Sequence, residues 1–214
     1  MRLEALEALV DEAGLPSRGL SAAAAERMAA YFEQRAHWAR VHNLSGPATL
    51  QDPWTTDGLD AIAVHHCLAP RAQVVDVGTG NGVPGFLLAC LDPAREVLLV
   101  EPRLKRIAFL RSAAGRLGLG NLRLHRGRWP APVGGEFQVV SRAVVAPSAW
   151  PTLATAGEPP ASVLRMLAEE DPWMDVVLVD EFHERSAEVD IIVAALRERQ
   201  RVGRVWGITS ATLA

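Results

Sequence analysis

The sequence predicts an α/β fold in which a mainly parallel sheet follows a small helical layer. Three observations support this prediction. Short apolar runs alternate with amphipathic segments from residue 73 onward, a glycine-rich turn follows the first run, and the first 70 residues show helical periodicity. The chain has 214 residues, of which 49% are hydrophobic and 22% charged, so it can bury a core of ordinary size.

The helical layer is predicted from periodicity and stop signals. Apolar residues among the first ten recur at helical spacing, and Gly14 ends this helix. Ser21 can N-cap a second helix that runs to about Arg40. The span Gly46–Gly58 is rich in Pro, Gly and Thr, so we expect a loop there.

The second part of the chain alternates strands and helices, as βαβ crossovers require. The expected strands are Val74–Val77, Val97–Val100, Leu122–Leu124, Phe137–Val140, Val176–Val179 and Val205–Ile208. The expected helices are Gly85–Leu91, Leu104–Leu117, Ser162–Glu170 and Ser186–Arg199, and residues 155–160 are the best linker candidate. We therefore expect a helical cap over 1–70, a ligand-binding α/β core over 71–150, and a segment over 151–214 that completes the sheet.

Charge and cysteine content narrow the class of protein. The net charge is −3, but residues 101–142 hold eight Arg, one Lys and two acids, which suits either a solvated helix face or a phosphate-facing patch. Cys67 and Cys90 lack metal-ligand spacing, so we expect buried thiols and no metal site. Since the sequence shows neither a long apolar run nor a signal peptide, we expect a cytoplasmic protein with no membrane partner. No feature indicates an oligomeric state.

The turn after the first strand, Asp76-Val-Gly-Thr-Gly-Asn-Gly-Val-Pro-Gly85, lies where open α/β sheets bind nucleotide-like ligands. Walker-type ATP binding is disfavoured because the turn has no Gly-Lys pair. Dinucleotide binding needs Gly-x-Gly-x-x-Gly, and Gly80, Gly82 and Gly85 satisfy that pattern formally. S-adenosylmethionine is favoured because Asp76 suits a cationic ligand, and Glu101, at the end of the next strand, can accept hydrogen bonds from ribose hydroxyls.

Four blocks in the same order resemble the bacterial small-subunit ribosomal RNA guanine-N7 methyltransferases, the RsmG or GidB family. The resemblance covers about residues 28–150. Its blocks are Trp38-Ala-Arg-Val-His-Asn43-Leu44-Ser45, Val75–Gly85, Glu101-Pro-Arg-Leu-Lys105-Arg106 with Phe109-Leu110-Arg111 and Leu117-Gly118-Leu119, and Phe137-Gln-Val-Val-Ser141-Arg142-Ala143. The resemblance implies a class I methyltransferase (Rossmann-like) fold with an N-terminal helical cap, S-adenosylmethionine as cofactor, and guanine N7 of small-subunit ribosomal RNA as acceptor.

Site residues follow from these blocks. The expected cofactor-binding residues are Asp76, Gly78, Thr79, Gly80, Asn81, Gly82, Glu101 and Pro102. The expected substrate-binding residues are Asn43, Arg103, Lys105, Arg106, Arg128 and Ser141, with Arg123 and Arg126 as further RNA-backbone contacts. Arg142 is the catalytic candidate, because it follows a strand end and could bind guanine O6 or a phosphate. Asn43 also suits a simple helix end, and Arg142 a surface position over apolar area.

The chain departs from the family in two places. The family usually shows Arg-His ahead of an Asp-Ser-Leu stretch, where this chain has Thr56-Asp57 ahead of Gly58-Leu59-Asp60-Ala61, which would remove two cations from the RNA or cofactor side. Residues 151–214 instead resemble a truncated DEAH-box RNA helicase segment, through Val163–Leu167, Val176–Ser186 and Thr209–Leu213. The helicase roles of Asp180, Glu181 and His183 are not expected here, because the chain has no Gly-Lys-Thr loop.

Three hypotheses therefore stand on the sequence. The first is a methyltransferase that uses S-adenosylmethionine, acting on ribosomal RNA. The second is a methyltransferase for a small heteroaromatic molecule, suggested by the lost cations at Thr56 and Asp57. The third is a non-catalytic nucleotide- or RNA-binding protein that arose from a methyltransferase–helicase fusion.

Overall fold

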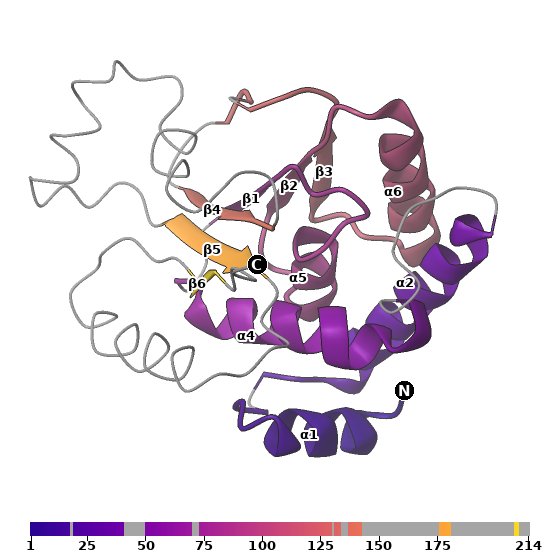
Figure 1. The fold of residues 1–214 in the computed structure, drawn as a ribbon, viewed down its shortest axis with the longest axis vertical. Coiled ribbons are helices and arrows are strands. Elements are labelled where there is room, and N and C mark those ends of the chain that lie inside the picture. Colours follow the sequence, from indigo (N-terminus) through magenta and orange to yellow (C-terminus); the bar gives the residue numbers. More distant parts are fainter. Residues whose placement is uncertain are drawn as a thin grey trace, which may run out of the picture.

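A single sheet with helices packed on one face organises the described part of the protein (Figure 1). The structure is a computed structural model. It describes residues 1–17, 19–40, 50–69, 73–129, 131–133 and 137–142, together with the backbone of two further strands at 176–180 and 208–209. The predicted helices Ser162–Glu170 and Ser186–Arg199, the linker 155–160 and Asn43 lie outside the described residues.

The sheet has the strand order β3-β2-β1-β4-β5-β6, and every pair is parallel. The chain reverses its direction of travel across the sheet at β1, between β2 and β4, and open α/β sheets bind ligands at such a switch point. The strands are β1 (Gln73–Val77), β2 (Val97–Val100), β3 (Leu122–His125), β4 (Phe137–Ser141), β5 (Val176–Asp180) and β6 (Ile208–Thr209). The predicted Rossmann-like α/β class is therefore confirmed. The last strand is described at Ile208–Thr209 and overlaps the predicted span Val205–Ile208 at Ile208, while residues 205–207 lie outside the described residues.

Alternation along the central strands separates two cores. Val74 and Leu99 belong to the large core under the helices, whereas Val75 and Leu98 face a smaller cluster that includes Trp129. Successive side chains of a strand point to opposite faces of the sheet. Because both faces are covered here, runs such as Val97–Val100 are apolar throughout. The helices that cover the large core are α1 (Leu3–Glu12), α2 (Ala22–Ala39), α4 (Leu59–Cys67), α5 (Gly85–Leu91) and α6 (Leu104–Leu117).

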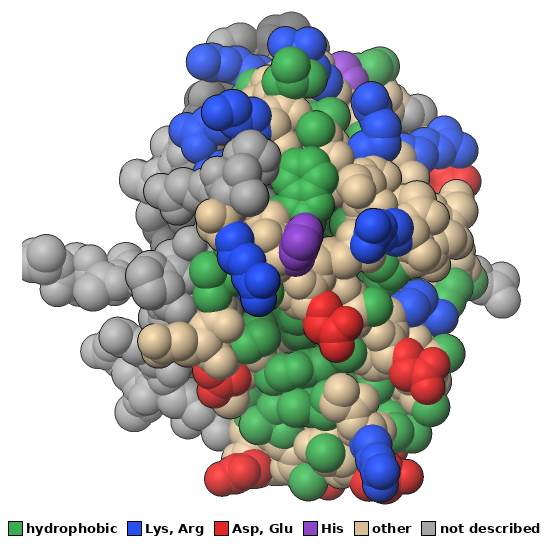
Figure 2. Space-filling view, turned by 90° about the vertical axis from the view of Figure 1, so that its right-hand side faces the viewer, with side chains coloured by type: hydrophobic (Ala, Val, Ile, Leu, Met, Phe, Trp, Pro, Cys, Tyr) green, Lys and Arg blue, Asp and Glu red, His purple; other side chains and the backbone are tan. Residues whose placement is uncertain are grey.

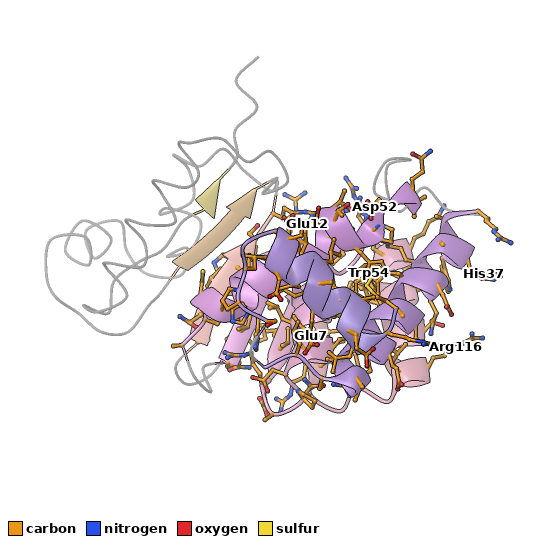
Figure 3. All side chains as sticks on the ribbon, turned by 90° about the horizontal axis from the view of Figure 1, so that it is seen from below. Glu7, Glu12, His37, Asp52, Trp54 and Arg116 are labelled. Carbon is orange, nitrogen blue, oxygen red and sulfur yellow. The ribbon has the colours of Figure 1, made fainter. Side chains whose placement is uncertain are left out.

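The helix ends follow local chemistry that the sequence displays. The Ser21 side chain accepts a hydrogen bond from the Ala24 N–H at 3.1 Å, so it caps α2 as predicted. Gly118 adopts a left-handed conformation and ends α6 at the predicted residue. Figure 3 shows α1 in front of the other helices, with Glu7 and Glu12 along it.

The predicted loop Gly46–Gly58 is wrong over its second half. Residues Trp54–Gly58 form a π-helical turn, η1, that runs directly into α4. Just ahead of it, the Asp52 carboxylate accepts a hydrogen bond from the Thr55 N–H at 3.2 Å. The Trp54 ring packs edge-on against Phe32 of α2, with ring centroids 4.9 Å apart, and this packing outweighs the turn-forming composition.

Candidate functional site

The candidate site lies at the carboxyl ends of β1, β2 and β4. The glycine-rich turn leaves β1 there and leads into α5. Backbone N–H groups of Gly78 and Thr79 donate to the Val100 carbonyl at 2.8 and 3.1 Å, so the turn is fastened to the end of β2. The turn therefore has one fixed path beside the switch point of the sheet.

Three glycines of this turn have positive φ, which L side chains rarely adopt: Gly78 at 69°, Gly80 at 61° and Gly82 at 107°. Gly82 is also enclosed, since a Cβ there would lie 2.7 Å from Leu110 Cδ2 and 2.9 Å from Phe86 Cβ. Glycine is thus required by backbone conformation at Gly78, Gly80 and Gly82, and by packing as well at Gly82.

Asp76 lies beneath the turn with its side chain fully buried. Its Oδ2 accepts hydrogen bonds from the Thr79 hydroxyl at 2.5 Å and from the Gly85 N–H at 2.8 Å. Its Oδ1 has no hydrogen-bond partner among the described residues. Burial raises the pKa of Asp76 to about 6, against the opposing effect of these two donors. One oxygen therefore shapes the turn, while the other is a buried acceptor that a ligand could satisfy.

Glu101 joins the turn to the segment after β2. It is 2% exposed, and its Oε2 accepts from the Gly80 N–H at 3.0 Å while Oε1 accepts from the Arg103 N–H at 2.8 Å. The Arg106 guanidinium lies 3.5 Å from Oε2. Each carboxylate oxygen can accept two hydrogen bonds, so Glu101 retains capacity for hydroxyl groups of a ligand. Pro102, which follows it, is exposed.

The remaining predicted residues differ in burial and position. Arg103, Lys105 and Arg128 are exposed, as a contact to RNA would require. Ser141 is buried, and its hydroxyl donates to the Val77 carbonyl at 2.8 Å, so in this structure it ties β4 to β1. Asn81 lies in the turn, where its backbone carbonyl is an acceptor for the helical cap.

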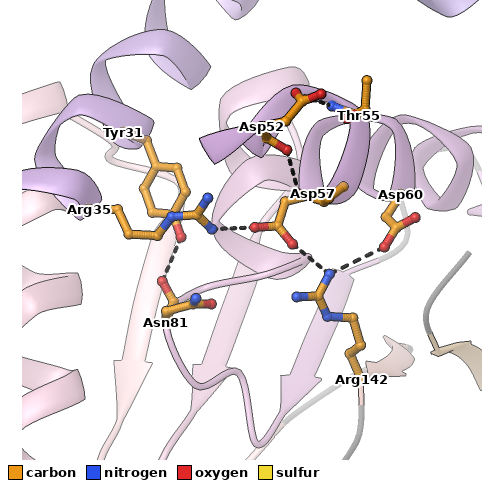
Figure 4. Close-up of polar contacts among 9 residues, drawn as sticks. Tyr31, Arg35, Asp52, Thr55, Asp57, Asp60, Asn81 and Arg142 are labelled. Carbon is orange, nitrogen blue, oxygen red and sulfur yellow. Dashed lines mark hydrogen bonds and ion pairs between the residues drawn. The ribbon is translucent and has the colours of Figure 1, made fainter. Parts of the chain in front are cut away.

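Arg142 lies just past β4 and is held by two carboxylates. Its Nη1 lies 2.6 Å from Asp57 Oδ1 and 3.2 Å from Asp60 Oδ2 (Figure 4). Asp57 is 0% exposed and also forms an ion pair with Arg35 of α2. Asp57, which stands where the family has a cation on the RNA or cofactor side, is therefore buried between two arginines. Burial lowers the pKa of Arg142, but the Asp57 and Asp60 carboxylates outweigh it and raise that pKa above its ordinary value.

Sequence reasoning missed two residues of α2 that reach the site. The Tyr31 hydroxyl donates to the Asn81 carbonyl at 2.6 Å, and its ring stacks on Phe86 with centroids 4.6 Å apart. Arg35, one helical turn later, lies over the Tyr31 and Phe32 rings and reaches Asp57 (Figure 4). Their i, i+4 spacing places both on one helix face, but nothing in the sequence indicated that this face meets the glycine turn.

The described residues hold neither a membrane-spanning helix nor a metal cluster. Within the described ranges, no helix is both long and apolar enough to cross a membrane. No group of three or more His, Cys, Asp or Glu side chains that could hold a metal ion occurs in the part of the chain that the structure describes. The helicase-like resemblance of residues 151–214 stays a prediction, because Glu181 and His183 lie outside the described residues.

Comparison with known proteins gives a family match and several relatives. The family model GidB, described as rRNA small subunit methyltransferase G, matches residues 24–155. A ribosomal RNA small subunit methyltransferase G from Halorhodospira halophila is 35% identical over 130 residues, which cover 61% of this chain and 62% of that protein. The protein of the same name from Stenotrophomonas maltophilia is 36% identical over 135 residues, covering 62% and 63%. That from Mycobacterium leprae is 38% identical over 121 residues, covering 54% and 49%. The chain thus spans about half to three-fifths of the length of these relatives.

Proposed function

This chain belongs to the GidB family, and on that premise we propose that it is an S-adenosylmethionine-dependent methyltransferase that acts on guanine N7 of small-subunit ribosomal RNA. The observation that carries the proposal is the glycine turn itself. Two buried acids, Asp76 and Glu101, hold this turn beside the switch point of the sheet. The family match covers the turn and both acids.

The residues present fit a sulfonium nucleoside better than a phosphate. Asp76 has a buried oxygen without a hydrogen-bond partner among the described residues, and a carboxylate there attracts a cation and repels a diphosphate. Glu101 has lone pairs left for a ribose diol. When bound, S-adenosylmethionine supplies an electrophilic methyl group. Asp76, Glu101 and the turn Gly78–Gly82 would hold it.

The acceptor chemistry asks little of the protein beyond alignment. Guanine N7 carries a free lone pair, so no general base is needed, and holding the two reactants in line supplies much of the rate enhancement. Arg142 lies at the carboxyl end of β4 and is 23% exposed, so it can present N–H donors to guanine O6 or a phosphate.

The RNA backbone would contact the basic segment that starts at α6. Its exposed members among the described residues are Arg103, Lys105, Arg111, Arg116, Arg123, Arg126 and Arg128. Figure 2 shows Lys and Arg side chains concentrated in the upper part of the face drawn, with Asp and Glu mostly below them. Such a distribution favours one orientation of a polyanion on a chain whose net charge is only −3.

The small-molecule alternative loses the part of its argument that concerns Asp57. It was suggested by the replacement of two cations at Thr56 and Asp57, yet Asp57 is fully buried and paired with Arg35 and Arg142. An acid in that position adds no negative charge to the surface that RNA would meet. RNA therefore remains the favoured acceptor.

Transfer of a labelled methyl group to small ribosomal subunits, naked ribosomal RNA and a nucleobase panel tests the proposal. We expect label in the RNA of one or both ribosomal samples, at guanine N7, and none in free nucleobases. Gly80→Arg should abolish transfer, because Gly80 has φ 61° and Arg106 already lies 3.3 Å from its Cβ position. Gly120→Arg is the matched control, since a Cβ at Gly120 meets nothing within 4 Å. Label confined to free nucleobases would contradict the proposal.

A further inference from the structure

We propose that Asp57 is a positioning residue that sets the direction of the Arg142 guanidinium at the acceptor side of the site. Arg35 fixes Asp57 through an ion pair with its other carboxylate oxygen. The inference rests on the proposed function and adds to it a residue that does not touch the substrate. The three side chains come from η1, the end of β4 and α2, which are distant in sequence and meet only in the fold (Figure 4).

The two oxygens of Asp57 have separate partners. Oδ1 lies 2.6 Å from Arg142 Nη1, and Oδ2 pairs with Arg35 Nη1. With one arginine on each oxygen, the carboxylate has little freedom to turn. Arg35 is itself fixed, because it is 1% exposed and its guanidinium carbon lies 5.1 Å from the centre of the Phe32 ring. The direction of Asp57 is therefore determined by buried structure, not by solvent.

Asp60 supplies a second contact to the same nitrogen of Arg142. Its Oδ2 lies 3.2 Å from Nη1, and Asp60 is 1% exposed. Two arginines and two carboxylates thus balance in charge, as buried ions require. Asp57 makes the shorter contact, so we assign it the larger share in orienting Arg142.

The arrangement leaves Arg142 able to bind a further group. An arginine carries five N–H donors, and both carboxylates use Nη1 alone. Nη2 and Nε donate to no described residue, and the side chain is 23% exposed. A guanidinium held at one nitrogen, with no described residue at its other nitrogens, can present a fixed pair of donors, which a freely rotating arginine could not do without losing side-chain entropy.

A double-mutant cycle on methyl transfer tests this inference. In the wild-type background, we expect Asp57→Asn to lower kcat/KM for the RNA acceptor roughly tenfold or more, while the Kd for S-adenosylhomocysteine changes less than about twofold. In an Arg142→Gln background the same substitution should lower kcat/KM less than about twofold further, because Asp57 then has nothing to orient. Asp57→Glu should recover part of the loss.

The control is a carboxylate that pairs with a buried arginine elsewhere. Asp92 lies 3.3 Å from Arg95 Nε, after α5 and ahead of β2, so it belongs to the opposite end of the sheet. Asp92→Asn should leave kcat/KM for the acceptor within about twofold in both backgrounds. If Asp57→Asn does not fold, Asp60→Asn replaces it in the cycle and should show a smaller loss with the same dependence on Arg142.

The outcomes separate this inference from the function beneath it. A wild-type chain that transfers no methyl group to RNA would overturn the proposed function and the inference together. An active wild type in which the losses from Asp57→Asn and Arg142→Gln multiply independently would overturn the inference alone. So would an equal loss of S-adenosylhomocysteine binding, because Asp57 would then support the fold of the cofactor turn and not Arg142.

Discussion

Gly85, the first residue of α5, is the position where one added methyl group should disturb the site most directly. A Cβ there would overlap Leu99 Cδ2 and lie 2.6 Å from both Cβ and Oδ2 of Asp76. Both neighbours are fully buried, so neither can swing into solvent. Gly85→Ala therefore forces the strand and the helix apart, or pushes Asp76 out of its contact with the glycine turn.

The cost can be estimated from core overpacking. Extra methyl groups in a packed core cost about 1–3 kcal/mol in the free energy of unfolding. For a chain of this size each kcal/mol lowers Tm by about 2–4 °C, so we expect a fall of about 2–12 °C. Affinity for S-adenosylmethionine should drop as well, by roughly tenfold, since the turn loses the Oδ2 contacts that fix Thr79 and Gly85.

Thermal unfolding by circular dichroism and a calorimetric titration measure both effects. The control is Gly115→Ala in α6, where a Cβ meets nothing within 4 Å and alanine favours the helix by about 0.5–1 kcal/mol. Gly115→Ala should raise Tm by about 1–4 °C. If Gly85→Ala raised Tm as much as Gly115→Ala does, the close packing of α5 on Asp76 would be refuted.

Three further predictions follow from single contacts. Tyr31→Phe removes the donor to the Asn81 carbonyl but keeps the ring. It should lower the free energy of unfolding by about 1 kcal/mol, measured by chemical denaturation, and weaken S-adenosylmethionine binding several-fold, measured by calorimetry. Unchanged values would disprove the link between α2 and the turn. Burial raises the pKa of Asp76 to about 6, and the carboxylate is the form that attracts a cation. The affinity for S-adenosylmethionine should therefore fall as the pH drops below 6, and this fall should approach tenfold per pH unit. Asp76→Asn should show no such fall between pH 7 and pH 4.5. Burial raises the pKa of the Cys90 thiol to about 12. A thiol reagent at pH 8 should therefore modify the half-buried Cys67 and spare Cys90 until the chain unfolds. Rapid modification of both thiols in the native protein would contradict the described core.

Local signals were enough to predict most of the described elements. The bounds Gly85–Leu91 and Leu104–Leu117 agree with the sequence prediction at both ends, because a glycine or proline marks their boundaries. The strands β1 and β2 followed from apolar runs that are buried on both faces. The prediction of a loop at Trp54–Gly58 was wrong because composition indicated a loop, whereas the packing of Trp54 on Phe32 stabilises a helical turn there.

The parts of the site that depend on local sequence patterns were predicted, whereas contacts between distant parts of the chain were not. The conformations of the glycine turn and the placement of Asp76 follow from neighbours in sequence, and Glu101 was located from its place at the end of the next predicted strand. The roles of Tyr31 and Asp57 depend on contacts across 50 and 85 residues of chain, to Asn81 and Arg142. One sequence shows which residues are charged or aromatic, but not which of them meet.

Calorimetric titration of the full chain with S-adenosylmethionine, and separately with ATP and magnesium, tests the central claim most directly. We predict one S-adenosylmethionine bound per chain, an affinity reduced roughly tenfold or more in Glu101→Gln, and no heat of binding with ATP. Binding of ATP and magnesium without S-adenosylmethionine would contradict the account, since the turn beside Asp76 and Glu101 would then hold phosphates and not a sulfonium nucleoside.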